Sequence, residues 1–195
     1  MRIGLLVALV FIGCEAEEEV DTQLQTILNL SPLESPPPDP TNHVADNTKA
    51  AQWGKHLFND ARLSTNGEVS CASCHKEEHG FADDAYLSKG LLLSERHTPS
   101  LWNIAWNRWF FWDGRADSTW AQALKPLESD LEHGFNRLAL AHLIQNDEML
   151  IEAYESIFEA MPDLSDTTRF PQDGRPMEDE THPDHIAWSN MNESD

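Results

Sequence analysis

The chain has 195 residues, a length that suits one domain with a hydrophobic core of its own. Its 34 acidic side chains against 13 lysines and arginines give a formal net charge of −21 at pH 7. This charge argues against binding to nucleic acid or to an anionic lipid surface, and it favours a basic partner. Only three cysteines are present, so the use of each can be considered separately.

The first segment explains one cysteine. After Met1 and Arg2, residues 3–12 form an apolar run that is too short to cross a bilayer as a helix and that predicts a secretory signal over residues 1–13. The end of this run resembles a bacterial lipobox, which implies cleavage before Cys14 and lipidation of its thiol. The alternative is an ordinary signal peptide with an incidental cysteine. Both predict a periplasmic protein, and the lipid would anchor it to a membrane surface without a spanning helix.

Residues 14–47 are acidic at first and then rich in proline, a composition that is typical of an extended tether. A short helix over residues 21–30 is the only regular element that we expect there. The folded domain is therefore expected at residues 48–195.

The fold class predicted for this domain is all-α. A helix over residues 49–59 has apolar side chains at helical spacing, and Asn47 or Thr48 can cap it. Further helices are expected over residues 98–106, 118–124, 136–145 and 147–161. Residues 76–95 contain breaking glycines and predict a loop, and no helical pattern continues beyond residue 162. No alternation typical of β-strands is present.

Cys71, Cys74 and His75 form the attachment signature of a c-type haem. On a helix, two thiols at this spacing share one face and can bond to the two vinyl groups of one haem edge. His75 would then be the proximal iron ligand. A disulfide, half of a zinc site or a thioredoxin-like redox pair are the alternatives. A zinc site needs a second ligand pair and a redox pair needs a βαβ pattern, and neither is present. The signature predicts one covalent haem c.

Four groups of residues, in this order along the chain, resemble the N-terminal haem domain of the bacterial di-haem cytochrome c peroxidases and their methylamine-utilisation relatives. They are Gly54-Lys55-x-Leu57-Phe58-x-Asp60-x-Arg62-Leu63-Ser64, the haem signature with Gly80-Phe81, Arg96-x-Thr98-Pro99-Ser100-Leu101-x-Asn103 and Phe111-Trp112-Asp113-Gly114-Arg115. The resemblance runs from about Thr48 into the C-terminal stretch. It implies a cytochrome c-like helical domain around the haem.

The resemblance also implies roles for three further residues. Gln122 and Glu132 match the distal glutamine and glutamate of the peroxide-reacting haem, and Trp112 matches a tryptophan between the two haems that helps electron transfer. A proton must move between the two oxygens of hydrogen peroxide before their bond breaks, and a carboxylate can carry it. An amide can orient the peroxide by hydrogen bonding. From the residues alone, Glu132 is better explained as one more solvated acid, and Trp112 is equally well explained as a buried ring.

Three departures from the family pattern bear on the prediction. His97 stands where the family has an asparagine beside a calcium ion between the domains, which puts that calcium in doubt. No histidine is present around Lys89 and Gly90, where the classical peroxidases carry a removable distal ligand, so the haem is expected to be permanently open. The chain has one haem signature where the family has two, so we expect it to be half of a larger di-haem protein or complex, with residues 169–188 leading toward the other half.

The sequence thus predicts a haem-dependent peroxidase that reduces hydrogen peroxide with electrons from a small carrier protein of the cytochrome c or cupredoxin type. One rival is a non-enzymatic electron-transfer cytochrome with a methionine as sixth iron ligand. Its candidates beyond the haem signature are Met149, Met161, Met177 and Met191. A second rival is an inactive binding or scaffold remnant.

Overall fold

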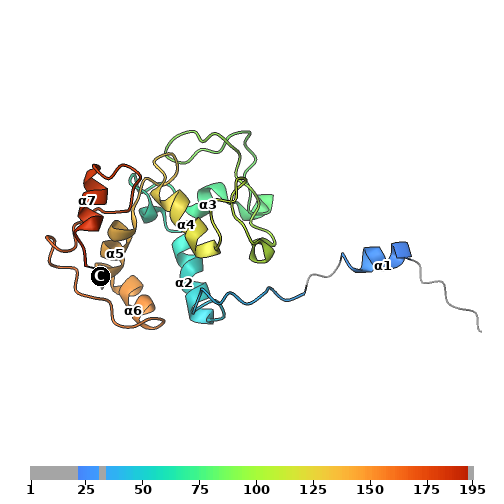
Figure 1. Cartoon of the computed structure of the whole chain (residues 1–195), viewed down its shortest axis with the longest axis horizontal. Helices are drawn as coiled ribbons and strands as arrows, with labels where there is room; N and C mark the ends of the chain where they lie inside the picture. The colour runs from blue at the N-terminus through green and yellow to red at the C-terminus, as the bar shows by residue number, and fades with distance from the viewer. Residues whose placement is uncertain (1–21, 31–33, 193–195) are drawn as a thin grey trace, which may run out of the picture. The chain divides into compact units, whose positions relative to one another are not determined.

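The computed structural model describes residues 22–30 and 34–192 and divides the chain into two compact units, residues 1–35 and 36–195 (Figure 1). In the first unit the described part holds helix α1, Thr22–Leu28, which confirms the short helix expected there. The secretory signal and Cys14 lie outside the described residues. Within the described ranges, no helix has the length and apolar character needed to cross a membrane.

The second unit is helical, which confirms the predicted class. Between residues 36 and 192 the structure has only isolated β-bridges, at residue pairs 76/82, 89/93 and 110/116. The helices and 3₁₀ turns are α2 (Thr48–Phe58), η1 (Ala61–Leu63), α3 (Cys71–Cys74), η2 (Glu77–His79), η3 (Ile104–Trp106), α4 (Thr119–Glu128), α5 (Arg137–Gln145), α6 (Glu148–Glu155) and α7 (Pro183–Ser189).

Side-chain caps explain where four of these helices begin. Asn47 Oδ1 accepts hydrogen bonds from the backbone of Lys49 at 2.9 Å and of Ala50 at 3.3 Å, which satisfies two free N–H groups at the start of α2. The same role falls to the residue before each of three later helices, namely Ser118, Asn136 and Asp147. These four starts agree with the predicted ones.

The helix expected over residues 98–106 is wrong, because only its last turn is helical, as η3. The Ser100 hydroxyl donates to Gly80 O at 2.6 Å, and Asn103 has a positive φ of 61°, a backbone conformation that a right-handed helix does not contain. The residues before η3 therefore form an irregular loop, which the Ser100 hydroxyl joins to the loop at Gly80.

Two helix ends and one additional helix differ from the prediction. Helix α4 continues beyond residue 124 to Glu128 and includes Pro126, whereas α6 stops at Glu155 instead of residue 161. Helix α7 was not expected. It starts with Pro183 in its first turn, and His182 Nδ1 accepts a hydrogen bond from Asp184 N at 3.1 Å.

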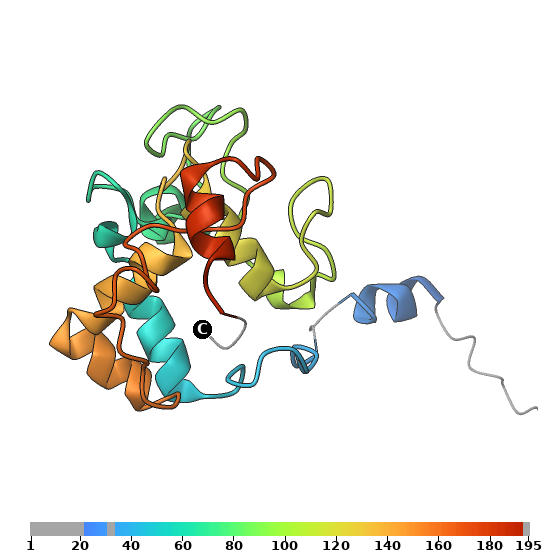
Figure 2. The same ribbon diagram turned by 60° about the vertical axis from the view of Figure 1, so that its left-hand side comes forward.

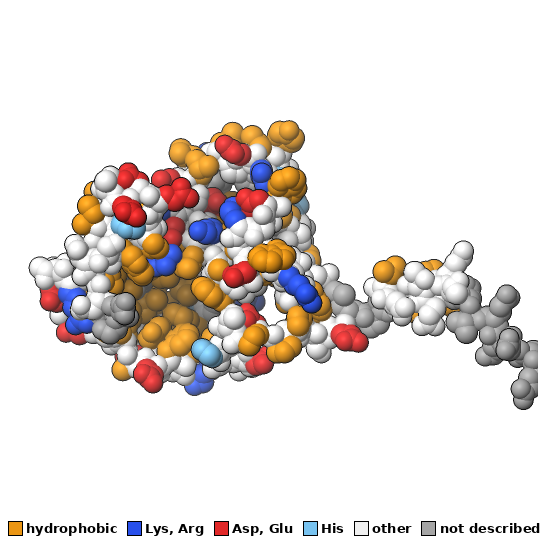
Figure 3. All heavy atoms as spheres, in the orientation of Figure 1, with side chains coloured by type: hydrophobic (Ala, Val, Ile, Leu, Met, Phe, Trp, Pro, Cys, Tyr) orange, Lys and Arg blue, Asp and Glu red, His pale blue; other side chains and the backbone are white. Residues whose placement is uncertain are grey.

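The core of the second unit lies where α5 packs against α4 and α6, and α2 packs against α6 (Figures 1 and 2). Leu150 of α6 is 1% exposed, and Trp53 of α2 meets the Tyr154 ring edge-on at 5.9 Å between ring centres. Hydrophobic side chains also gather in a hollow on the face shown in Figure 3, over the region of α2, α5 and α6. Long loops connect α3 with α4, and another long segment connects α6 with α7 (Figure 1).

Candidate haem site

The two haem-signature cysteines occupy opposite ends of α3. The start of this single turn is closed by Ser73, whose Oγ accepts a hydrogen bond from Ser70 N at 3.0 Å. Cys71 and Cys74 are both free and half-buried, and burial raises the pKa of both thiols above the ordinary value. The structure therefore presents two unpaired thiols one helical turn apart, as a haem edge with two vinyl groups requires.

His75 directly follows this turn, and its ring is oriented by the next loop. Its Nδ1 lies 2.8 Å from Phe81 O. Gly80 and Phe81 both have positive φ, 67° and 58°, and Phe81 N donates to Lys76 O at 2.8 Å, so the tight loop turns the Phe81 carbonyl back toward the histidine. Because a carbonyl can only accept, Nδ1 is the donor of this hydrogen bond, and in the neutral ring Nε2 then carries the lone pair. That tautomer fits an iron ligand.

A buried hydrogen-bond network, which the sequence analysis did not anticipate, pins the loop beside Cys74. The Ser88 hydroxyl donates to Asp83 Oδ2 at 2.5 Å and lies 2.6 Å from Thr98 Oγ1. Burial would raise the pKa of Asp83, but the hydrogen bonds from Ser88 and Thr98 outweigh it and lower that pKa. The loop then passes Cys74, whose Sγ lies 3.8 Å from Lys89 O.

The same loop supports the turn that carries Glu132. Leu91 N donates to Glu132 O at 3.0 Å, and Leu92 N donates to Leu131 O at 2.9 Å. Gly90 is in such close contact that a Cβ there would lie 2.6 Å from Glu132 Cα and 2.8 Å from Glu132 O. Only glycine fits at this position without displacing the backbone of the turn.

From the other side, a buried histidine fixes this turn. His133 is 4% exposed, its Nδ1 lies 2.8 Å from Leu63 O, and its carbonyl accepts from Thr65 N at 3.0 Å. The loop that precedes the haem signature is thereby joined to the residue next to Glu132.

These contacts bring Glu132 to the haem signature. Burial is the largest cause of the raised pKa of Cys71 and Cys74, and the negative charge of Glu132 is a smaller cause for both. The Glu132 carboxylate therefore lies close enough to act electrostatically on both thiols. The side chain is half-buried, and within residues 22–30 and 34–192 it accepts no hydrogen bond. The structure thus groups Glu132 with the three residues of the haem signature.

Gln122 lies in the first half of α4 and is half-buried. Its amide forms no hydrogen bond with any residue that the structure describes, Glu132 included. The two predicted distal residues therefore come from neighbouring elements, a helix and the turn after it, and form no hydrogen bond with each other.

Trp112 is not a buried ring, because it is 89% exposed. It lies at the tip of a turn that is closed by Phe110 N donating to Ala116 O at 2.9 Å. The Arg96 guanidinium lies 5.4 Å from the centre of its ring. Arg115, which is ion-paired with Asp113 at 2.8 Å, stacks on the neighbouring Phe111 ring at 3.6 Å. The structure therefore places Trp112 on the surface.

Three further residues that the sequence analysis considered are Met149, Met177 and His97. Met149, on α6, is 69% exposed, and Met177 N donates to His185 Nδ1 at 3.0 Å in the C-terminal segment. His97 is exposed, with Nδ1 3.2 Å from Thr98 O. Among the described residues, no group of three or more histidines, cysteines and acidic side chains could hold a metal ion.

Comparison with known proteins assigns the chain to a protein family. A family model described as di-haem cytochrome c peroxidase matches residues 48–177, two thirds of the chain, and the chain belongs to that family. The c-type haem is the cofactor that this family implies.

Individual relatives agree with this assignment. Residues of the chain are 47% identical to methylamine utilization protein MauG of Methylorubrum extorquens over 76 residues, which are 38% of this chain and 22% of MauG. They are 39% identical to cytochrome-c peroxidase IdrP2 of Denitromonas iodatirespirans over 119 residues, 60% of this chain and 29% of that protein. The chain thus spans less than a third of the length of these relatives.

Solved structures share the fold. A MauG-like protein associated with microbial copper homeostasis superimposes with a TM-score of 0.57 at 28% identity, over 67% of this chain and 40% of that one. The diheme peroxidase BthA from Burkholderia thailandensis gives a TM-score of 0.52 at 28% identity, over 66% of this chain and 36% of BthA.

Proposed function

We propose that this chain is the peroxide-reacting haem domain of a di-haem peroxidase, with one haem c bound covalently by Cys71 and Cys74. His75 is the proximal iron ligand. The fit rests on two free thiols one helical turn apart and on a histidine whose Nδ1 proton is held by the Phe81 carbonyl. The bound haem would supply a ferric iron at which hydrogen peroxide is activated.

The observation that carries the peroxidase function is the place of Glu132. Its half-buried carboxylate, within electrostatic reach of both attachment thiols, accepts no hydrogen bond from the described residues. Such a group can take a proton from one oxygen of hydrogen peroxide and return it to the other, which makes water the leaving group. Gln122, on the helix that leads to this turn, is the donor that we propose to orient the peroxide.

Electrons would arrive through the exposed loops between α3 and α4. Trp112 is 89% exposed there, and the same loops expose other large apolar side chains, namely Leu92, Leu93, Trp102 and Trp109. We propose that a second haem domain or subunit covers this surface, with Trp112 on the electron path. The net charge of −21 suits a basic carrier of the cytochrome c or cupredoxin type as the donor.

The proposal includes a place in the cell. Removal of residues 1–13 and lipidation of Cys14 would hold the domain on the periplasmic side of a bacterial membrane, with residues 14–47 as tether. Residues 36–47 belong to the second compact unit, and Thr41 Oγ1 accepts from Trp120 Nε1 at 3.0 Å. These residues therefore add contacts to the haem domain as well as length to the tether.

The test is the reaction of the ferric, haem-loaded protein with hydrogen peroxide in a stopped-flow instrument. Glu132→Gln keeps the size of the side chain but removes the proton acceptor, so peroxide should still bind while cleavage of the O–O bond slows by about 10²–10⁴. Glu95→Gln makes the same chemical change at an exposed loop position and should leave the rate unchanged. Equal rates for the two variants would contradict the proposed role of Glu132.

A further inference from the structure

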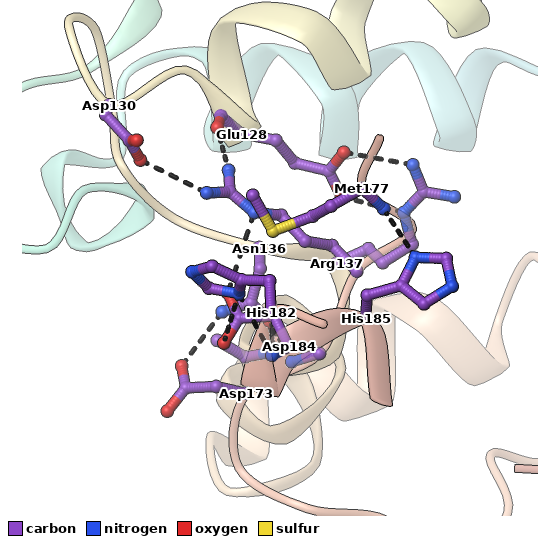
Figure 4. Close-up of polar contacts among 12 residues, drawn as sticks. Glu128, Asp130, Asn136, Arg137, Asp173, Met177, His182, Asp184 and His185 are labelled. Atoms are coloured by element: carbon purple, nitrogen blue, oxygen red, sulfur yellow. Dashed lines mark hydrogen bonds and ion pairs between the residues drawn. The ribbon is translucent and has the colours of Figure 1, made fainter. Parts of the chain in front are cut away.

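Arg175, a buried arginine of the C-terminal segment, donates hydrogen bonds to Glu128 and Asp130 at the start of the turn that carries Glu132; Figure 4 labels these two partners. The Arg175 side chain is 10% exposed, Nη1 donates to the backbone carbonyl of Glu128, and Nη2 donates to Asp130 Oδ1 at 3.1 Å. On the far side of the guanidinium, Nε lies 3.6 Å from Asp184 Oδ2 without a hydrogen bond. Arg175 thus lies between the end of α4 and the first turn of α7.

The position of this guanidinium is itself fixed. Arg175 N donates to Asp184 O at 3.2 Å, and Gly174 N donates to Asn136 Oδ1 at 3.3 Å. Asn136 also donates from Nδ2 to Asp173 Oδ1 at 2.8 Å. Residues 173–175 are therefore tied to the first residues of α5, which lie directly after the Glu132 turn.

The two ends of the turn are also tied to each other. Arg137 Nε donates to Glu128 Oε1 at 2.8 Å and Arg137 Nη2 to Glu128 Oε2 at 3.0 Å, a bidentate pair between the last residue of α4 and the first of α5. The Arg137 guanidinium lies 5.1 Å from the centre of the Trp188 ring of α7. This pair holds the end of α4 next to the start of α5, and Arg175 holds the backbone between these two helices at residues 128 and 130.

We propose that Arg175 is a positioning residue for Glu132. The inference rests on the proposed function of Glu132 and extends it to the C-terminal segment. The planar guanidinium has five donors in a fixed fork, so it can hold the carbonyl at residue 128 and the carboxylate at residue 130 at once. From residue 130 the chain has only two residues to reach Glu132, whose backbone is held on the opposite side by Gly90 and Leu91.

A positioning role makes a specific kinetic prediction for the haem-loaded full chain. Arg175→Gln removes the fork and should slow O–O cleavage by about 10², the usual cost of a misplaced catalytic group, with little change in the peroxide concentration that gives half-maximal rate. Arg175→Lys keeps the charge but cannot hold both oxygens, so its rate should fall between those of Arg175→Gln and the unchanged protein. If Arg175→Gln does not fold, Arg175→Lys still tests the positioning role.

The double variant separates positioning from general loss of stability. If Arg175 acts through Glu132, adding Arg175→Gln to Glu132→Gln should slow the reaction no further than Glu132→Gln alone. Asp184→Asn is the matched control, because it removes a charge beside Arg175 Nε and His182 Nδ1 and leaves the contacts of Arg175 with residues 128 and 130 in place. It should leave the rate unchanged even if the melting temperature falls.

Three results would overturn the inference. They are an unchanged rate in folded, haem-loaded Arg175→Gln and Arg175→Lys, multiplying losses in the double variant, or a rate loss in Asp184→Asn equal to that in Arg175→Gln. An unchanged rate in Glu132→Gln by itself would instead contradict the proposed function, and the positioning role of Arg175 would fall with it. Covalent haem content and the melting temperature, recorded for every variant, show that each comparison is made on folded protein.

Discussion

Two turns of this molecule carry predicted functional side chains, and they are held in opposite ways. The turn with Glu132 is contacted from three sides, by the loop with Gly90 and Leu91, by the loop that receives His133, and by Arg175. The turn with Trp112 is closed by a backbone hydrogen bond between its own ends.

The difference matches what each chemistry needs. A general acid–base group must stay within hydrogen-bond reach of the proton that it moves. Contacts within the folded protein therefore have to offset the conformational entropy that its turn loses on ordering. A surface tryptophan that serves an electron path acquires its second partner only on association, and an exposed aromatic tip suits such a contact. Under the proposed function, the fold itself holds the turn with Glu132, and the turn with Trp112 is left for a partner to cover.

The largest effect that we expect concerns the haem on which this comparison depends. Replacing Cys71 and Cys74 together by alanine should abolish all haem that survives denaturation and acid–organic extraction, because thioether bonds to these two sulfurs are the covalent attachment. Absorbance of the extracted protein measures this. Covalent haem that persists in the double variant would remove the basis for placing Glu132 and Trp112 relative to a haem.

A methyl group at Gly90 should break the held turn. Its Cβ would lie 2.6 Å from Glu132 Cα, so the backbone must shift, at a cost of about 1–3 kcal/mol of stability. The displaced carboxylate should slow the peroxide reaction by about 10². Urea unfolding and stopped-flow absorbance measure the two effects.

Gly114, in the turn with Trp112, provides the matched comparison. It has φ +71°, and the nearest atom to an added Cβ is 3.8 Å away, so alanine there should cost about 1–2 kcal/mol from the backbone conformation alone. The peroxide reaction should keep its rate. If the two alanine variants slowed it equally, the contrast between the two turns would be wrong.

The smallest effect is expected for Trp112→Ala in the isolated chain. Because the ring is 89% exposed and its centre lies 5.4 Å from the Arg96 guanidinium, its loss should change the free energy of unfolding by less than about 1 kcal/mol. Leu150→Ala, at a side chain 1% exposed, should cost about 2–5 kcal/mol in the same urea titration. A large loss for Trp112→Ala would show that the tip supports the fold rather than a partner.

Local signals predicted most of the helices. Asn47, Ser118, Asn136 and Asp147 all cap the helices expected after them, since a cap acts within three residues of its own position. The expected helix over residues 98–106 was wrong because Ser100 is used by Gly80, a residue twenty positions away. Contacts of that range leave no trace in local periodicity.

The site residues also differ in whether local sequence signals predict them. The haem signature is contiguous, so it could be predicted from the residues alone, whereas Glu132 needed a resemblance to a known family, because the chain around it is simply acidic. The supports of Glu132 were missed. From the sequence, Gly90 is interpreted only as a helix breaker, although it packs against the backbone of Glu132. The position of Arg175 depends on contacts with Glu128 and Asp130, which are more than forty residues away in the chain, and with Asp184.

The most direct test of the central claim, that Glu132 faces an open iron position, is the optical and electron paramagnetic resonance spectrum of the ferric haem-loaded chain. The account predicts a high-spin haem, or one that holds only water opposite His75. A low-spin haem with a methionine–iron charge-transfer band would contradict it, because an occupied sixth position leaves hydrogen peroxide no place to bind. The chain would then be an electron-transfer cytochrome.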